Sequence, residues 1–166
     1  MAIKEKSGTD NFDSPILMHS YSVNRTDVCN YEMVNGKLAF TILNTGPENK
    51  TTANLNINLG SVKAGETCKI TFDVNMFDGQ GNVNKNGFAY NIGTELNAPT
   101  SSLINSWKVL PNGTIEIEYT ATEDIANLYL YLRGQTTTIN NSISAGQSIL
   151  PLTAYIDNVS IVKESV

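Results

Sequence analysis

Two glutamates in one short run, Glu116 and Glu118, are the side chains whose spacing comes nearest to that of a catalytic pair. On one strand they would point to the same side, roughly 6–7 Å apart, a separation found between glycosidase carboxylates. A solvated sheet face explains the same pattern equally well, and no acid with an apolar pocket accompanies them. The single histidine, His19, is expected to be structural or exposed. We therefore expect no enzymatic activity.

A second group of side chains suits ligand binding. Tyr129, Tyr131 and Arg133 alternate with leucines in NLYLYLRG, so all three point away from the leucine side of a strand. A tyrosine ring stacks on the C–H face of a sugar while its hydroxyl forms hydrogen bonds. Phe88 and Tyr90 in GFAYNIG are candidates to extend this carbohydrate-binding surface. The alternative is that these rings pack beneath loops or against a partner subunit.

Composition excludes several classes of protein. A chain of 166 residues fits one domain that buries roughly 70% of its unfolded surface, so it needs no disulfide or metal to fold. The net charge is −5 and the eleven basic residues are scattered, which argues against binding to nucleic acid. No stretch approaches the ~18 apolar residues of a membrane-spanning helix. The N-terminal MAIKEKSGTDNF lacks the apolar segment of a signal peptide, so we expect synthesis and folding in a cytoplasm.

The two cysteines, Cys29 and Cys68, do not form a metal-binding or disulfide pattern. Cys68 alternates with the apolar residues Ile70, Phe72 and Val74, which is typical of a small core residue. Buried free thiols are therefore favoured over a Cys29–Cys68 bridge.

Short alternating runs, rather than helical periodicity, must position the candidate side chains. Turn signals such as VNGK and PNGT separate these runs. Eight or nine such strands predict an all-β, single-domain β-sandwich (jelly roll) with an aliphatic core between two antiparallel sheets. The predicted strands are residues 17–23, 37–43, 53–60, 68–77, 87–93, 107–110, 114–121, 127–134 and 155–162. Residues 134–148, rich in Asn, Ser and Thr, are expected to form a long loop.

Four motifs follow one another along the chain. They are VNGKLAFTI (34–42), NLNINLGSVKAGETCKITFDV (54–74), SWKVLPNGTIEIEYTATEDIANLYLYLRG (106–134) and AYIDNVSIV (154–162). In this order they resemble the jelly-roll carbohydrate-binding modules that accompany bacterial glycanases, a fold also found in bacteriophage virion surface proteins. The sequence departs from the family pattern at Cys68, where a tyrosine is usual, and at TTAN, where a tryptophan often stands. The single tryptophan, Trp107, falls on a motif that usually packs rather than binds sugar.

The resemblance also implies a structural calcium ion. Asp157, in the closing YIDNVSIV strand, matches the family aspartate that helps to hold Ca²⁺ near the joined chain ends. Asp13, and less securely Asp10, would supply a partner carboxylate, because calcium prefers hard oxygen ligands. The alternative is that Asp157 accepts backbone N–H bonds at a bulge or crossing.

These observations predict a non-enzymatic virion surface protein of a bacteriophage, either a capsid decoration protein or head fibre or a tail adhesin. It would be made in the host cytoplasm and displayed on the particle, with residues 1–14 as an arm that contacts other virion proteins and residues 15–166 as the jelly-roll domain. Its own subunits and a polysaccharide are the other expected partners. The alternatives are an extracellular carbohydrate-binding module of a secreted bacterial glycoside hydrolase, and a cell-surface adhesin or lipoprotein domain.

Overall fold

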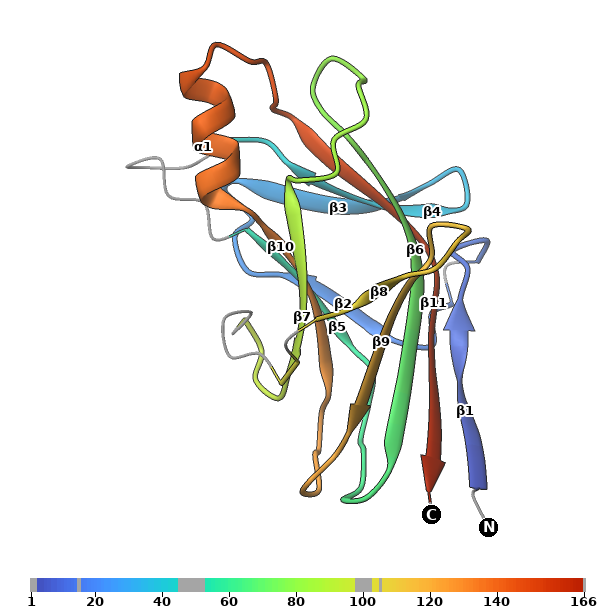
Figure 1. Ribbon diagram of the computed structural model, residues 1–166. Helices are drawn as coiled ribbons and strands as arrows, with labels where there is room; N and C mark the ends of the chain where they lie inside the picture. The colour runs from blue at the N-terminus through green and yellow to red at the C-terminus, as the bar shows by residue number, and fades with distance from the viewer. Residues whose placement is uncertain (1–2, 15, 45–52, 98–102, 105, 166) are drawn as a thin grey trace.

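Alternating apolar and polar residues form two antiparallel sheets that pack face to face, with one helix at one end of the molecule (Figure 1). The computed structural model describes residues 3–14, 16–44, 53–97, 103–104 and 106–165. The strands are β1 (Ile3–Asp10), β2 (Ser20–Val23), β3 (Cys29–Val34), β4 (Lys37–Ile42), β5 (Asn54–Asn58), β6 (Thr67–Phe77), β7 (Phe88–Gly93), β8 (Lys108–Val109), β9 (Ile115–Thr120), β10 (Tyr129–Gly134) and β11 (Leu152–Ser165). The helix is α1 (Thr136–Ser144).

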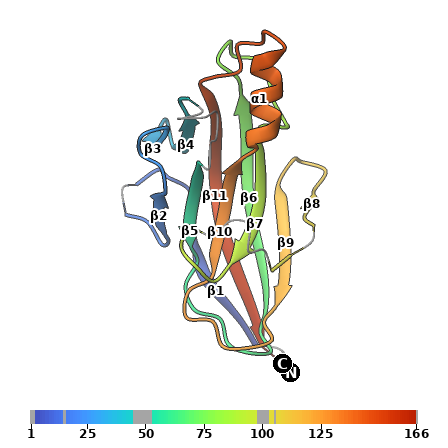
Figure 2. The same cartoon turned by 90° about the vertical axis from the view of Figure 1, so that its left-hand side faces the viewer.

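The two sheets differ in size. The larger sheet has seven strands in the order β3-β4-β11-β6-β9-β8, and β1 pairs with the C-terminal part of β11. The smaller sheet has the order β2-β5-β10-β7. Figure 2 looks onto this four-stranded sheet, with β2, β5, β10 and β7 running from left to right. This arrangement confirms the predicted all-β, single-domain sandwich.

The core lies between the sheets and is made of the inward-pointing residues of both. Phe40, Phe72, Leu55, Leu130 and Ile117 are among its fully buried side chains. All nine predicted runs contain a strand, and two strands were not predicted. Those two are β1, whose sequence is mostly polar, and β3, an edge strand with mostly exposed side chains. Neither shows the apolar alternation on which the prediction depended.

The predicted long loop at residues 134–148 is wrong, because residues 136–144 form the helix α1. Its Thr, Asn and Ser residues have modest helix propensity, and no side chain caps its first turn. Ile139, in its middle, is fully buried in the core beside Gly134. Tertiary packing of one apolar residue therefore stabilises a helix that local sequence does not encode. No helix in the described part of the chain has the length and apolar character needed to cross a membrane.

The N-terminal segment pairs with the C-terminal strand. β1 runs antiparallel to β11, from Ile3 opposite Ser165 to Asp10 opposite Val159. Residues 3–10 thus extend the larger sheet, where the sequence predicts a loosely tethered arm. The boundary between an arm and a domain at residue 14 stays a prediction.

Both cysteines are buried and free, as predicted. Burial raises the pKa of the Cys68 thiol to about 11, and burial also raises the pKa of Cys29. Both thiols are therefore protonated at neutral pH and serve as small core residues.

Candidate ligand-binding face

Amide, hydroxyl and aromatic side chains line the outward side of the four-stranded sheet. Leu55 and Ile57 of β5 are buried in the core, so the alternating asparagines of β5 point outward. On β10, the leucines point inward and the two tyrosines and the arginine point outward. We call the following side chains the polar face: Ser22, Asn54, Asn56, Asn58, Asn91, Tyr129, Tyr131 and Arg133.

Strand register places these side chains in rows across the sheet. Asn54 of β5 lies opposite Arg133 of β10, and the next two rows pair Asn56 with Tyr131 and Asn58 with Tyr129. Side chains directly opposite on one face are close enough to interact. The structure therefore brings Tyr129, Tyr131 and Arg133 together, as the sequence predicts, and adds a column of asparagines beside them.

Asn56 is the centre of a hydrogen-bond network on the polar face. Its amide nitrogen donates to Asn97 Oδ1 at 2.7 Å and to Ser22 Oγ at 3.3 Å. Its Oδ1 accepts from Asn54 Nδ2 at 2.5 Å and from the Asn97 backbone N–H at 3.2 Å. Asn54 and Asn56 are both buried. The network therefore holds the residues that follow β7 against the outward side of β5.

Tyr131 is buried beneath this segment instead of being exposed for sugar stacking. Its side chain is 0% exposed, and its hydroxyl donates a hydrogen bond to the Glu95 carbonyl oxygen. Burial raises its pKa to about 12. The Tyr129 ring stacks on it with centroids 6.1 Å apart and is itself half-buried. Of the two tyrosines, Tyr129 is thus the one available to a ligand, while Tyr131 supports it from below.

Two buried polar atoms on the polar face have no hydrogen-bond partner within the described residues. They are Asn54 Oδ1 and Arg133 Nε, from the two residues that lie opposite each other in the sheet. Burying a polar atom without a partner costs about 1–3 kcal/mol. One atom is a neutral acceptor and the other is a charged donor, which is the combination that one hydroxyl group satisfies by donating and accepting.

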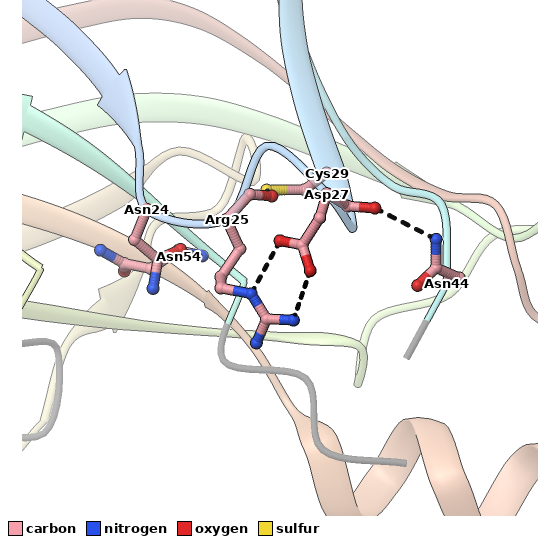
Figure 3. Close-up of polar contacts among 6 residues, drawn as sticks. All are labelled: Asn24, Arg25, Asp27, Cys29, Asn44 and Asn54. Atoms are coloured by element: carbon pink, nitrogen blue, oxygen red, sulfur yellow. Dashed lines mark hydrogen bonds and ion pairs between the residues drawn. The ribbon is translucent and has the colours of Figure 1, made fainter. Parts of the chain in front are cut away.

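The segment between β2 and β3 lies beside Asn54 of the polar face (Figure 3). Asn24 is bonded to Asn54 twice: the Asn54 backbone N–H donates to Asn24 Oδ1 at 2.8 Å, and the Asn24 N–H donates to the Asn54 carbonyl at 3.2 Å. Arg25 then forms a two-bond ion pair with Asp27, at 2.8 and 2.7 Å, which holds the pKa of Asp27 below its usual value. The Arg25 carbonyl accepts from the Cys29 N–H. These contacts fix the position of Asn54.

Phe88 and Tyr90 do not extend the polar face, and their predicted placement is wrong. Both side chains point into the sandwich, where Phe88 contacts Phe40 at 5.6 Å between centroids and Tyr90 contacts Phe72 at 5.2 Å. They share the inward side of β7 with Ile92 because every second residue of a strand points the same way. Both rings instead line a cleft at the open edge between the sheets.

The carboxylate of Asp157 lies at a bulge in β11 and faces another carboxylate. Its Oδ1 accepts the backbone N–H of Asn158 at 2.9 Å, which matches the alternative of backbone hydrogen bonding. Asp73 lies directly opposite in β6, and Lys37 lines the same shallow pocket. Among the described residues, no group of three or more His, Cys, Asp or Glu side chains is placed to hold a metal ion.

The two N-terminal aspartates lie in different surroundings. Asp13 is exposed, and its Oδ1 lies against Gly36. Asp10 is buried and accepts hydrogen bonds from Met18 N at 2.5 Å, His19 N at 3.0 Å and the Tyr21 hydroxyl at 2.7 Å. Asp10 thus joins β1 of the larger sheet to the start of β2 in the smaller sheet. Calcium binding by Asp157 and Asp13 stays a prediction.

Glu116, Glu118 and His19 lie outside the polar face. Glu116 and Glu118 point outward from β9 on the larger sheet, opposite Lys108 and Lys69 in the neighbouring strands. This placement matches the alternative of a solvated sheet face rather than a catalytic pair. His19 is buried beside Asp10, where its backbone N–H is bonded, as expected of a structural residue.

No protein-family model and no curated protein matches this chain. The solved structures with a similar fold include the following two. The first is the K1 cleaved adhesin domain of Lys-gingipain from Porphyromonas gingivalis W83, with a TM-score of 0.46 and 12% identity over 97% of both chains. The second contains the CBM22-1 and GH10 modules of the Clostridium thermocellum endo-1,4-β-D-xylanase 10B in complex with xylohexaose, with a TM-score of 0.43 and 13% identity. It is matched over 94% of this chain and 28% of the xylanase chain. At these scores neither match bears on function.

The asparagines of β5 are the part of the polar face that was not predicted as a site. Their signal is visible in the sequence, because NLNIN alternates amide and aliphatic side chains over five residues. Asparagine is depleted in strands, so a repeated outward asparagine indicates a role other than strand formation.

Proposed function

We propose that the polar face binds a neutral polysaccharide and that the chain is a non-enzymatic binding domain. The observation that carries this proposal is the pair of buried atoms Asn54 Oδ1 and Arg133 Nε, which have no hydrogen-bond partner among the residues that the structure describes. A sugar hydroxyl supplies both a donor and an acceptor, which are the two functions that these atoms require. The half-buried ring of Tyr129 adds an apolar surface in a neighbouring part of the same face.

The charge of the polar face supports a neutral ligand. Arg133 is its one ionisable group apart from the two tyrosines, and its other members carry amide or hydroxyl groups. Amides donate and accept equally well, which matches the many hydroxyls of a glycan better than it matches an ionic ligand. The two glutamates of β9 lie on the other sheet beside lysines, so they serve as solvated surface groups rather than as an acid and a nucleophile.

Affinity gel electrophoresis against a panel of soluble plant and bacterial polysaccharides tests this function. The wild-type protein is expected to be retarded by at least one neutral polysaccharide, and Tyr129→Ala and Arg133→Ala should each weaken binding about tenfold or more, as for loss of a stacked ring or a charged hydrogen bond. Glu118→Ala, on the opposite side of the sandwich, is the matched control and should bind like the wild type. Lack of retardation by every polysaccharide would contradict the proposal.

We further propose that this domain is displayed on the surface of a bacteriophage particle, as a capsid decoration protein, head fibre or tail adhesin. The motif order resembles that of carbohydrate-binding modules, and the occurrence of this fold in virion surface proteins supports this setting, as does a composition with only 16% charged residues. Mass spectrometry of gradient-purified particles should then detect the chain, and its gene should lie among capsid or tail genes. A gene placed beside a secreted glycanase, with no trace of the protein in particles, would favour the alternative of an enzyme-associated module.

Calcium is proposed as a structural ion held by Asp157 and Asp13. A bound ion stabilises the folded state by RT ln(1 + [L]/Kd), so saturating Ca²⁺ should raise the melting temperature by several degrees over an EDTA-treated sample. Asp157→Asn should abolish that shift, while Glu118→Gln should keep it. An identical melting temperature with EDTA and with excess Ca²⁺ would contradict the proposal that the protein binds calcium.

A further inference from the structure

A cleft opens at the edge of the sandwich where β7 of the smaller sheet faces β8 and β9 of the larger sheet. Figure 2 shows these three strands on one side of the molecule, away from β2. The cleft has a volume of about 290 Å³. Its walls include Phe88, Tyr90, Trp107, Val109 and Lys85. It is separate from the polar face, because Phe88 and Tyr90 project from the opposite side of β7.

The walls of this edge cleft are mainly apolar and aromatic. The Trp107 ring stands edge-on against the Tyr90 ring, with centroids 5.1 Å apart and an interplanar angle of 77°. At the rim, Val83 and Val109 are 65% and 66% exposed, although each lines the cleft. Exposed apolar side chains grouped around a concave aromatic surface mark a binding site more often than isolated ones do.

Tyr90 contributes a polar group that the fold leaves unused. Its side chain is 3% exposed and lines the cleft, and among the described residues its hydroxyl forms no hydrogen bond and is not one of the fully buried polar atoms. Tyr21 and Tyr131, the other deeply placed tyrosines, both donate from their hydroxyls to oxygens of the protein. Burial raises the pKa of Tyr90, so the hydroxyl keeps its proton at neutral pH and remains a donor.

The cleft wall carries a positive charge, whereas the net charge of the protein is negative. Lys85 is the one charged residue among the described residues that line it, whereas the whole chain carries a net charge of −5. A lysine without an acidic neighbour in the wall favours an anionic group at the mouth. An apolar interior with one hydroxyl in its wall favours an uncharged, ring-sized body below that group.

We propose that the edge cleft binds a small carboxylic acid with an apolar ring, such as an arylalkanoate. The ring packs between Trp107 and the apolar wall, the Tyr90 hydroxyl donates a hydrogen bond to the ligand, and Lys85 attracts the carboxylate. A volume of about 290 Å³ accommodates a single ring with a short chain, at the small end of ligand sites. This site is independent of polysaccharide binding on the polar face.

Trp107 makes the test direct, because it is the only tryptophan of the chain. Titration with 3-phenylpropionate, with excitation of tryptophan at the red edge of its absorption, should give a saturable change in emission. The uncharged analogue 3-phenylpropanol should bind about threefold to fivefold more weakly, which is the range for one partly exposed charge interaction. Tyr90→Phe should weaken binding about fivefold to tenfold through loss of one buried hydrogen bond.

Two lysine variants separate the cleft from general charge effects. Lys85→Gln should remove the preference for the acid over the alcohol, whereas Lys69→Gln, on the outward side of the larger sheet, should keep it. Backbone amide NMR shifts give a second readout that does not depend on Trp107, and they should concentrate at Val83, Lys85 and Val109. Three results would each overturn the proposal. The first is the lack of a saturable response up to 10 mM, on the order of the weakest specific binding. The others are equal affinity for the acid and the alcohol, and NMR shifts confined to the polar face.

Discussion

The outward sides of the two sheets have opposite chemistry. On the larger sheet, Lys69 lies opposite Glu118 and Lys108 lies opposite Glu116, so unlike charges alternate across exposed strands. On the smaller sheet, amides and rings form the rows, and Asn54 and Asn56 are buried although they lie on an outward side. Of these two sets of side chains, the asparagines of the smaller sheet are the ones that are shielded from water.

The difference shows which face is built for binding. Exposed opposite charges contribute about 0–1 kcal/mol per pair because water solvates both groups. A ligand would therefore recover little free energy on the charged face. A buried amide oxygen or guanidinium nitrogen without a partner costs about 1–3 kcal/mol, and a ligand recovers that free energy.

Asp10 connects the two sheets, so its removal should have the largest effect. Asp10→Ala leaves two backbone N–H groups and the Tyr21 hydroxyl without their acceptor, and should lower the free energy of unfolding by about 3 kcal/mol. Urea denaturation followed by tryptophan fluorescence measures this change. Asp13→Ala, three residues along and exposed, is the control, with a change below about 0.5 kcal/mol when both variants are measured in EDTA so that no calcium contributes. Equal losses in both variants would contradict the assigned role of Asp10.

The alkaline limit of stability should reflect the buried tyrosines of the smaller sheet. Burial raises the pKa of Tyr131 to about 12, above the ordinary value of 10, and it also raises those of Tyr21 and Tyr90. The unfolded chain releases these protons first, so stability is complete below pH 10 and falls as the pH rises from 10 to 12. Urea midpoints at pH 9, 10 and 11 measure the slope. Tyr131→Phe should reduce that slope, and an unchanged slope would place the Tyr131 hydroxyl in solvent.

Two neighbouring tyrosines give a matched comparison of support and contact. Tyr131→Phe loses the hydrogen bond to the Glu95 carbonyl and should cost about 1 kcal/mol of stability at pH 7. Tyr129→Phe has a half-buried ring and should change stability by less than about 0.5 kcal/mol. Thermal denaturation measures both. A larger loss for Tyr129→Phe than for Tyr131→Phe would reverse their roles.

The charged face should tolerate substitution. Glu118→Gln removes the exposed carboxylate that lies opposite Lys69 in the sheet and should change the free energy of unfolding by about 0.5 kcal/mol or less. Added salt should shrink the difference further because the two opposite charges lie in solvent. A loss above about 2 kcal/mol in urea denaturation would show that this face is structurally as demanding as the smaller sheet.

Alternation in the sequence was sufficient to predict the sandwich, the inward leucines of β10 and the outward placement of Tyr129 and Arg133. It could not predict that Tyr131 is covered, because the segment that reaches it follows a different strand. The misplacement of Phe88 and Tyr90 was avoidable, since Ile92 shares their side of GFAYNIG and marks it as the core side. The helix α1 depends on the burial of Ile139, a tertiary contact with no local signal.

The central claim is that Asn54 and Arg133 receive a sugar hydroxyl, and side-chain NMR tests it most directly. The Arg133 Nε–H and the asparagine Nδ2 groups give resolvable signals in a nitrogen-15 correlation spectrum of labelled protein. Titration with oligosaccharides from the polysaccharide that retards the protein most should shift the Arg133 Nε–H and the Asn54 and Asn58 amide signals, and leave the backbone amides of Lys69 and Glu118 in place. Binding that moves the signals of the larger sheet and leaves Arg133 Nε–H unchanged would contradict the account.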